Sequence, residues 1–153
     1  MSLEIERKFT VLNDSFKVDA YDVIHIKQGY IFSEDNKILR VRITQDYSKI
    51  AIKFGQDITR NEYEYDIPVS DAENLIKVCK GYIIDKKRYL VKNGDLIWEI
   101  DEFFQDNKGL IVAEIELEHE NQDFFKPDWI GEEVSYDKKY YNHYLSKKPF
   151  LTW

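Results

Sequence analysis

The sequence predicts a mainly β protein of the α+β class, in which about eight strands form an antiparallel barrel or a strongly curved sheet with a few flanking helices. Three observations favour this fold. Segments with a two-residue alternation of polarity recur along the chain, turn residues separate them, and only one or two segments have helical spacing. At 153 residues the chain fits one domain, residues 1–153, that is long enough to bury a core.

The composition narrows the classes of function. Hydrophobic residues make up 43% of the chain and charged residues 33%, which is typical of a globular protein. The formal net charge of -7 argues against bulk attraction to nucleic acid or to anionic membranes. The single cysteine, Cys79, excludes an internal disulfide and a cysteine-based zinc site. Without a membrane-spanning apolar run or a signal peptide, we expect a cytoplasmic protein with no nucleic-acid or membrane partner.

The first strand is expected at residues 3–12. Because side chains alternate between the two faces of a strand, Glu4, Glu6 and Lys8 share one face. One such face is typical of any half-solvated strand. Its repetition in later strands is therefore the informative observation.

Four more strands are expected before the first long helix, and a polar connector at residues 13–20 leads into them. We place them at residues 23–32, 37–44, 47–54 and 60–69. Their charged side chains again gather on one face of each strand, at Arg40, Arg42, Lys53, Glu62 and Glu64.

A helix is predicted at residues 70–80. Ser70-Asp71-Ala72-Glu73 is close to a capping box, and Gly81 is expected to end the helix. Strands resume at residues 83–91, 96–104 and 110–119, and Asn93-Gly94 makes a hairpin turn between the first two. Their charged pairs are Lys86 with Arg88, Glu99 with Asp101, and Glu114 with Glu116. A short helix is expected at residues 138–145.

The repeated charged faces predict a tunnel with a charged interior and an apolar outer surface. Buried charges are costly unless they are paired or bind ions, so the interior should hold a charged ligand. Clustered carboxylates suit Mg²⁺ or Mn²⁺, and arginines and lysines neutralise phosphate oxygens. A polyphosphate bound with a divalent metal would use both sets, whereas the alternative is a salt-bridged face that is open to solvent.

With these residues assembled, the chain resembles the CYTH superfamily, the triphosphate tunnel metalloenzymes. Glu4-Ile5-Glu6-Arg7-Lys8-Phe9 matches the E-x-E-x-K signature of that family in its EIERKF form. The resemblance continues in family order through Gln28-Gly29-Tyr30, Arg40-Val41-Arg42, Ile52-Lys53, Arg60-Asn61-Glu62-Tyr63-Glu64, Lys86-Lys87-Arg88-Tyr89, Glu99-Ile100-Asp101, Ala113-Glu114-Ile115-Glu116 and Trp129-Ile130-Gly131-Glu132-Glu133-Val134.

The resemblance implies an eight-stranded antiparallel tunnel that acts on a triphosphate with Mg²⁺ or Mn²⁺. The implied metal ligands are Glu4, Glu6, Asp101, Glu114 and Glu116. The implied catalytic residues are Glu62, Glu64 and Lys8. The implied phosphate-binding residues are Lys8, Arg40, Arg42, Lys53, Lys86, Arg88 and Lys138. Lys138 enters this set because Lys139 stands where the family commonly has an arginine.

The leading hypothesis is a triphosphatase, a hydrolase of phosphoric anhydrides, that cleaves inorganic triphosphate or a related triphosphate. The compact length and the EIERKF form favour it by analogy over a class IV adenylate cyclase, and a thiamine triphosphatase is a further alternative. A third alternative is a catalytically silent module that binds polyphosphate or a nucleotide. The expected partner is a small-molecule triphosphate, and the expected state is a monomer or a homodimer.

Overall fold

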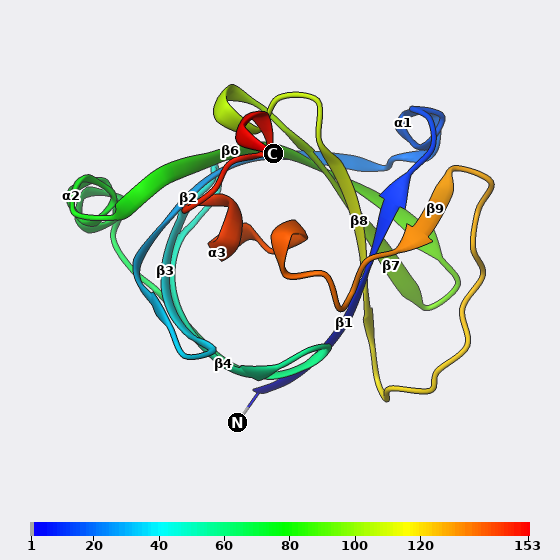
Figure 1. Ribbon diagram of the computed structural model, residues 1–153, viewed down its shortest axis with the longest axis horizontal. Helices are drawn as coiled ribbons and strands as arrows, with labels where there is room; N and C mark the ends of the chain where they lie inside the picture. The colour runs from blue at the N-terminus through cyan, green and yellow to red at the C-terminus, as the bar shows by residue number, and fades with distance from the viewer. Residues whose placement is uncertain (1) are drawn as a thin grey trace.

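The computed structural model describes residues 2–153, and its strands close into a ring (Figure 1). The nine strands are β1 (Ser2–Val11), β2 (Asp22–Glu34), β3 (Lys37–Ile43), β4 (Ser48–Gln56), β5 (Thr59–Asp66), β6 (Lys80–Asn93), β7 (Leu96–Phe103), β8 (Ile111–Leu117) and β9 (Ile130–Glu133). Eight of them form the ring in the order β1-β5-β4-β3-β2-β6-β7-β8, and β9 is attached to β1. All described pairings are antiparallel, so the predicted mainly β tunnel is confirmed.

The ring closes through only part of β1. Residues from Ser2 to Ile5 pair with β5, whereas Phe9 and Val11 pair on the same edge with β9. The chain that follows β9 then bonds to β1: the amide of Val134 donates to the carbonyl oxygen of Lys8 at 2.8 Å, and the Lys8 amide donates to Ser135 Oγ at 2.9 Å. The C-terminal segment is thereby led into the ring, where α3 (Asn142–Leu145) lies (Figure 1).

The turns between the ring strands follow local chemistry. Asp35 and Asn36 both have positive φ in the hairpin between β2 and β3, a conformation that short polar side chains tolerate. Gly94 has φ +61 in the hairpin between β6 and β7, where the paired residues Asn93 and Leu96 leave a two-residue loop. These tight turns keep neighbouring strands in register, and hence keep their charged faces aligned.

An apolar core lies outside the ring, between the sheet and the segments that cover it. Phe9 and Trp98 meet edge to face, with ring centroids 5.6 Å apart, and Trp129 packs against Trp98. Phe16, in the short helix α1 (Phe16–Asp19), is fully buried against Trp129 and Tyr89. The prediction that apolar side chains pack outward is confirmed on this side, while α2 (Val69–Lys77) covers β2, β3 and β4.

Several sequence predictions were wrong in detail. The helix α2 spans Val69–Lys77 instead of residues 70–80, and no side chain caps its N-terminus. Gly81 does not end it but lies in β6 at φ +76, where a Cβ would clash with the carbonyl oxygen of Ser146. The helix expected at residues 138–145 is divided into η2 (Lys138–Tyr140) and α3. Neither β9 nor α1 was expected, because both are short and depend on packing against the ring.

Two further 3-10 turns complete the fold: η1 (Gln105–Asn107) and η3 (Phe150–Thr152). Across residues 2–153, no helix is both long and apolar enough to cross a bilayer.

Candidate active site

The ring encloses a cavity of about 190 Å³ that charged side chains line almost completely. The cavity is lined by seven acidic and seven basic side chains, so positive and negative groups balance overall. The acids are Glu4, Glu6, Glu62, Glu64, Glu99, Glu114 and Glu116, and the bases are Lys8, Arg40, Arg42, Lys53, Arg60, Lys86 and Arg88. The prediction of a charged tunnel interior is therefore confirmed.

Asp101 is the centre of a neutralised cluster in the wall. Its carboxylate accepts from Lys86 Nζ at 2.7 Å and from Arg88 Nε and Nη2 at 2.8 and 2.9 Å. Burial alone would raise the pKa of Asp101, but the charges of Arg88 and Lys86 lower it well below its usual range. Asp101 was predicted to be a metal ligand. In the structure it is fully buried and is not among the residues that line the cavity.

Glu99 lies in the cavity wall instead, two residues before Asp101 on β7. Antiparallel register sets Glu99 opposite Glu114 of β8, and Glu114 opposite Lys8 of β1. Oxygen atoms of Glu6, Glu99 and Glu114 all lie within 4.8 Å of one another, and we call these three residues the carboxylate cluster. In the sequence, Glu99 and Asp101 form a charged pair at spacing i, i+2. That spacing did not indicate which of the two lies near the other acids.

The carboxylate cluster and its neighbours concentrate negative charge. Burial raises the pKa of Glu116 to about 7, together with the negative charges of Glu4, Glu6, Glu99 and Glu62. Burial and the adjacent Glu6 also raise the pKa of Glu114. Three carboxylates that converge in this way supply the oxygen donors that Mg²⁺ and Mn²⁺ prefer. The donor set therefore fits a divalent cation, which would offset the repulsion between the acids.

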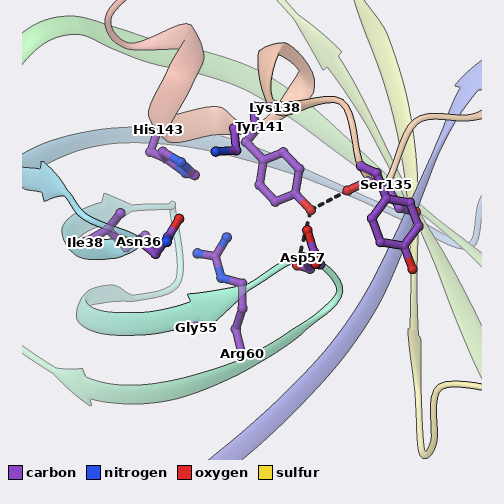
Figure 2. Close-up of a pocket in the computed structure, with 10 residues that line it drawn as sticks. Asn36, Ile38, Gly55, Asp57, Arg60, Ser135, Lys138, Tyr141 and His143 are labelled. Atoms are coloured by element: carbon purple, nitrogen blue, oxygen red, sulfur yellow. Dashed lines mark hydrogen bonds between the residues drawn. The ribbon is translucent and has the colours of Figure 1, made fainter.

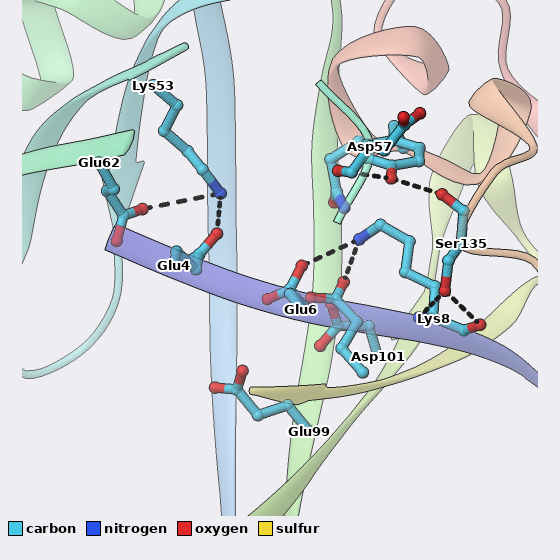
Figure 3. Close-up of polar contacts among 12 residues, drawn as sticks. Glu4, Glu6, Lys8, Lys53, Asp57, Glu62, Glu99, Asp101 and Ser135 are labelled. Carbon is cyan, nitrogen blue, oxygen red and sulfur yellow. Dashed lines mark hydrogen bonds and ion pairs between the residues drawn. The ribbon is translucent and has the colours of Figure 1, made fainter. Parts of the chain in front are cut away.

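Other cavity cations are paired with acids (Figure 3). Lys8 Nζ lies 3.0 Å from Glu114 and 3.2 Å from Glu6, and Lys53 Nζ lies 2.7 Å from Glu4. Arg40 Nη2 lies 3.1 Å from Glu64. Burial would lower the pKa of Lys8, but Glu114 and Glu6 raise it above its ordinary value. Lys8 is thus held protonated, as a fixed positive charge beside the carboxylate cluster.

Arg42 differs, because its guanidinium has no carboxylate within 4.0 Å among residues 2–153. Its Nε donates to Gln28 Oε1 at 2.8 Å. Burial and the charges of Arg40 and Arg88 lower the pKa of Arg42. The Nε of Arg40 is also buried with no hydrogen-bond partner. Unsatisfied buried donors are costly, and a phosphate oxygen would satisfy them.

The C-terminal segment limits one end of the cavity. Asn142 Oδ1 accepts from Lys86 Nζ at 3.0 Å, and the Tyr141 hydroxyl donates to the carbonyl oxygen of Ser135 at 2.6 Å. Burial lowers the pKa of His143 to about 3, assisted by the positive charges of Arg60 and Lys8, so this imidazole is neutral. We call the region of Arg60, Tyr141 and His143 the cationic end.

A smaller pocket of about 50 Å³ adjoins the cationic end, and Figure 2 shows its lining. Arg60, Tyr141 and His143 line both spaces. Lys138, predicted to bind phosphate, is exposed and lines only this smaller pocket. Lys139 points elsewhere, since its Nζ lies 4.7 Å from the centroid of the Trp153 indole. Sequence reasoning did not select Arg60, although it begins the Arg60-Asn61-Glu62-Tyr63-Glu64 run.

The other predicted site residues line the cavity. Of the predicted set, Glu4, Glu6, Lys8, Arg40, Arg42, Lys53, Glu62, Glu64, Lys86, Arg88, Glu114 and Glu116 line the one cavity. Residues 100 or more positions apart in the chain thus converge on one space, as the ring in Figure 1 requires.

The sequence of this chain is similar to those of known proteins. The family model described as the CYTH domain matches residues 2–146. An inorganic triphosphatase of Acetivibrio thermocellus is 44% identical over 152 residues, covering 98% of this chain and 97% of that protein. An inorganic triphosphatase of Nitrosomonas europaea is 34% identical over 147 residues, covering 94% of this chain and 96% of that protein.

A solved crystal structure of an inorganic triphosphatase is also similar to this fold. It superposes with a TM-score of 0.69 at 34% identity, covering 95% of each chain. The match of the family model, the two relatives and the shared tunnel lead to one conclusion: this chain belongs to the CYTH domain family.

Proposed function

We propose that this chain is a metal-dependent triphosphatase that hydrolyses inorganic triphosphate to pyrophosphate and phosphate. One observation carries the proposal: a single cavity holds both a convergent carboxylate cluster and a buried arginine, Arg42, that has no carboxylate partner among residues 2–153. The names of the similar proteins from Acetivibrio thermocellus and Nitrosomonas europaea support the same activity. Hydrolysis of a phosphoric anhydride requires alignment and neutralisation of charge more than covalent help from the protein.

The cations of the wall bind the triphosphate in this proposal. Arg42 and Arg40 provide guanidinium donors that no carboxylate fully occupies. Lys53, Lys86 and Arg88 come from neighbouring strands of the ring and face the same space. Arginine binds two phosphate oxygens at once and lysine acts as a point charge, so the set fixes the orientation of the chain of phosphates. Lys138, outside the cavity, is left as a rim residue in this scheme.

The carboxylate cluster would hold the divalent cation, with Glu4 and Glu116 beside it. A cation bound there would neutralise phosphate charge and polarise the oxygens that it contacts. Asp101 is not included, because Lys86 and Arg88 already occupy its carboxylate. Its role in the proposal is to fix those two cations in the wall.

Glu62 is the proposed base, with Glu64 next to it on β5. Burial raises the pKa of Glu62, partly opposed by Lys53 and reinforced by Glu4, so Glu62 accepts a proton more readily than an ordinary carboxylate. Water attacks a terminal phosphorus, its proton passes to Glu62, and the bond to the bridging oxygen breaks to leave pyrophosphate. Lys8, held protonated between Glu6 and Glu114, stabilises negative charge as it develops on the phosphate oxygens.

The test incubates purified protein with inorganic triphosphate, ATP or thiamine triphosphate, each with Mg²⁺ or with Mn²⁺. Phosphate release from inorganic triphosphate that is lost in Glu6→Gln supports the proposal. Cyclic AMP from ATP would instead identify a cyclase, and preferred cleavage of thiamine triphosphate a thiamine triphosphatase. Tight triphosphate binding without turnover in either metal would identify a binding module. The cytoplasmic location and the state as a monomer or homodimer stay predictions.

A further inference from the structure

Arg60 is a cation of the cavity wall that forms no ion pair among residues 2–153. No carboxylate lies within 4.0 Å of its guanidinium in the part of the chain that the structure describes, and its Nε is buried without a hydrogen-bond partner. Arg40, Lys8, Lys53, Lys86 and Arg88 each have an acidic partner. A guanidinium has five N–H donors and cannot lose its proton, so this state is costly in the absence of an anion.

The backbone directs Arg60 into the cavity. Arg60 lies on β5 opposite Glu4 of β1 on one side and Gly55 of β4 on the other. Gly55 has φ +133, and a Cβ there would come within 3.0 Å of the Arg60 Cα and 3.4 Å of its Cγ. The glycine therefore leaves room for the arginine stem where the two strands turn. Figure 2 shows the guanidinium pointing toward Tyr141 and His143.

A second cation, Lys8, shares an aromatic neighbour with Arg60. Arg60 Cζ lies 5.7 Å, and Lys8 Nζ 4.7 Å, from the centroid of the Tyr141 ring, so one aromatic side chain contacts both cations. Arg60 and Lys8 are also the charges that most strongly keep His143 neutral. A cation–π contact at 5.7 Å is weak compensation for a partly buried charge. Of these two cations, Lys8 is paired with Glu6 and Glu114, whereas Arg60 has no acidic partner among residues 2–153.

We propose that Arg60 is a further phosphate-binding residue, which holds the terminal phosphate of the substrate at the cationic end of the tunnel. The inference rests on the proposed triphosphatase function and extends it to one end of the substrate. A terminal phosphate presents more oxygens than an internal one, and a guanidinium binds two of them in parallel. The C-terminal segment, with Tyr141 bonded to Ser135, encloses this end, so the phosphate held there is the last of its chain.

The test compares Arg60→Gln and Arg60→Lys with the wild type. The KM for inorganic triphosphate should rise about 10- to 100-fold in Arg60→Gln, as expected for a lost hydrogen bond between charged groups. Arg60→Lys keeps the positive charge but loses the two parallel donors of the guanidinium. Its KM should lie between those of the wild type and Arg60→Gln. Lys87→Gln, which removes an equal charge from the exposed outer face of β6, is the matched control and should leave the KM unchanged.

Two additional measurements separate binding from folding and from turnover. Methylguanidinium added to Arg60→Ala should lower its raised KM, which a purely structural arginine would not allow. Calorimetric titration of inorganic triphosphate into metal-free protein should give a higher Kd for Arg60→Gln than for the wild type. If the wild type binds but does not hydrolyse triphosphate, the triphosphatase proposal fails while the role of Arg60 stands. Equal KM and Kd values in Arg60→Gln and the wild type would overturn the role of Arg60 alone, and no binding by the wild type would overturn both.

Discussion

One cavity holds an excess of negative charge at the carboxylate cluster and an excess of positive charge at Arg42 and Arg60. At the carboxylate cluster, acids outnumber bases and the pKa of the neighbouring Glu116 rises to about 7. At Arg42 and Arg60, guanidinium groups have no carboxylate partner among the described residues. A third set of charges is matched, and we call it the matched group: Asp101 pairs with Lys86 and with Arg88, and Arg88 also pairs with Glu99 of the carboxylate cluster.

The difference indicates which charges serve the fold and which serve ligands. Matched charges are satisfied by the protein, so removing one should damage stability. Surplus charges are satisfied only in part by the protein: the three acids of the carboxylate cluster share Lys8 and Arg88, and Arg42 and Arg60 pair with no carboxylate among residues 2–153. Binding of a cation or a phosphate would satisfy them fully, so removing one should damage function at little cost to the stability of the ligand-free chain.

Asp101→Asn tests the matched group. Lys86 would lose its carboxylate partner and Arg88 would keep only Glu99, so we expect the free energy of unfolding to fall by about 3–5 kcal/mol. Urea denaturation measures the change. Glu102→Gln is the control, since Glu102 pairs with Lys17 on the outer surface and exposed pairs contribute about 0–1 kcal/mol. Full stability in Asp101→Asn would remove the distinction between matched and surplus charges.

Glu99→Gln tests the carboxylate cluster. We expect the rate of triphosphate hydrolysis to fall by about 100-fold, because even the outer partners of metal ligands contribute about 10- to 100-fold. The metal-free protein should lose little stability, because Glu99 pairs with Arg88 Nη1 at 3.1 Å but also lies beside two other acids, and Arg88 keeps Asp101 as a partner. Initial rates over a range of Mg²⁺ and Mn²⁺ concentrations, with thermal unfolding alongside, give both quantities. Wild-type activity in Glu99→Gln would remove Glu99 from the cluster.

Arg42→Gln tests a surplus cation. The KM for triphosphate should rise by about 10-fold through the loss of a charge-assisted hydrogen bond. Stability without ligand should stay the same or increase, because a buried and unbalanced charge is gone. Steady-state kinetics and urea denaturation on the same preparation separate the two effects. A large loss of stability would instead place Arg42 with the matched group.

Glu116→Gln tests the pH dependence of stability at a neighbour of the carboxylate cluster. The folded-state pKa of Glu116, about 7, lies above its ordinary value of 4.5, so between these values the folded chain binds more protons than the unfolded chain. Through this group the stability of the metal-free protein is greatest below the ordinary pKa and is lost as the pH rises to the folded-state value. Thermal midpoints of wild type and variant from about pH 5 to 8 should therefore converge at low pH and favour Glu116→Gln at high pH. Parallel curves would contradict the raised pKa.

Some features of the site follow from local sequence alone. A strand alternates its side chains every two residues, so Glu4, Glu6 and Lys8 must share a face wherever the strand lies. The same rule placed Arg40 with Arg42 and Glu62 with Glu64, and the repetition of such faces predicted a charged tunnel. The structure confirms that these residues line one cavity.

Other features depended on tertiary structure. Alternation puts Glu99 and Asp101 on the same face of β7 and makes them equivalent. Register separates them: Asp101 lies opposite Arg88 of β6, whereas Glu99 lies opposite Glu114 of β8. The lack of a carboxylate partner for Arg60 among residues 2–153, and the strand β9 that guides the C-terminal segment into the ring, likewise arise from residues far away in the chain.

Local sequence thus sets the face on which each charged side chain lies, whereas the closed ring sets which of these side chains neutralise one another. The two effects differ in range. Side-chain direction in a strand is a local backbone property, whereas an ion pair needs two atoms within a few ångströms, which only the closed ring and its registers bring together.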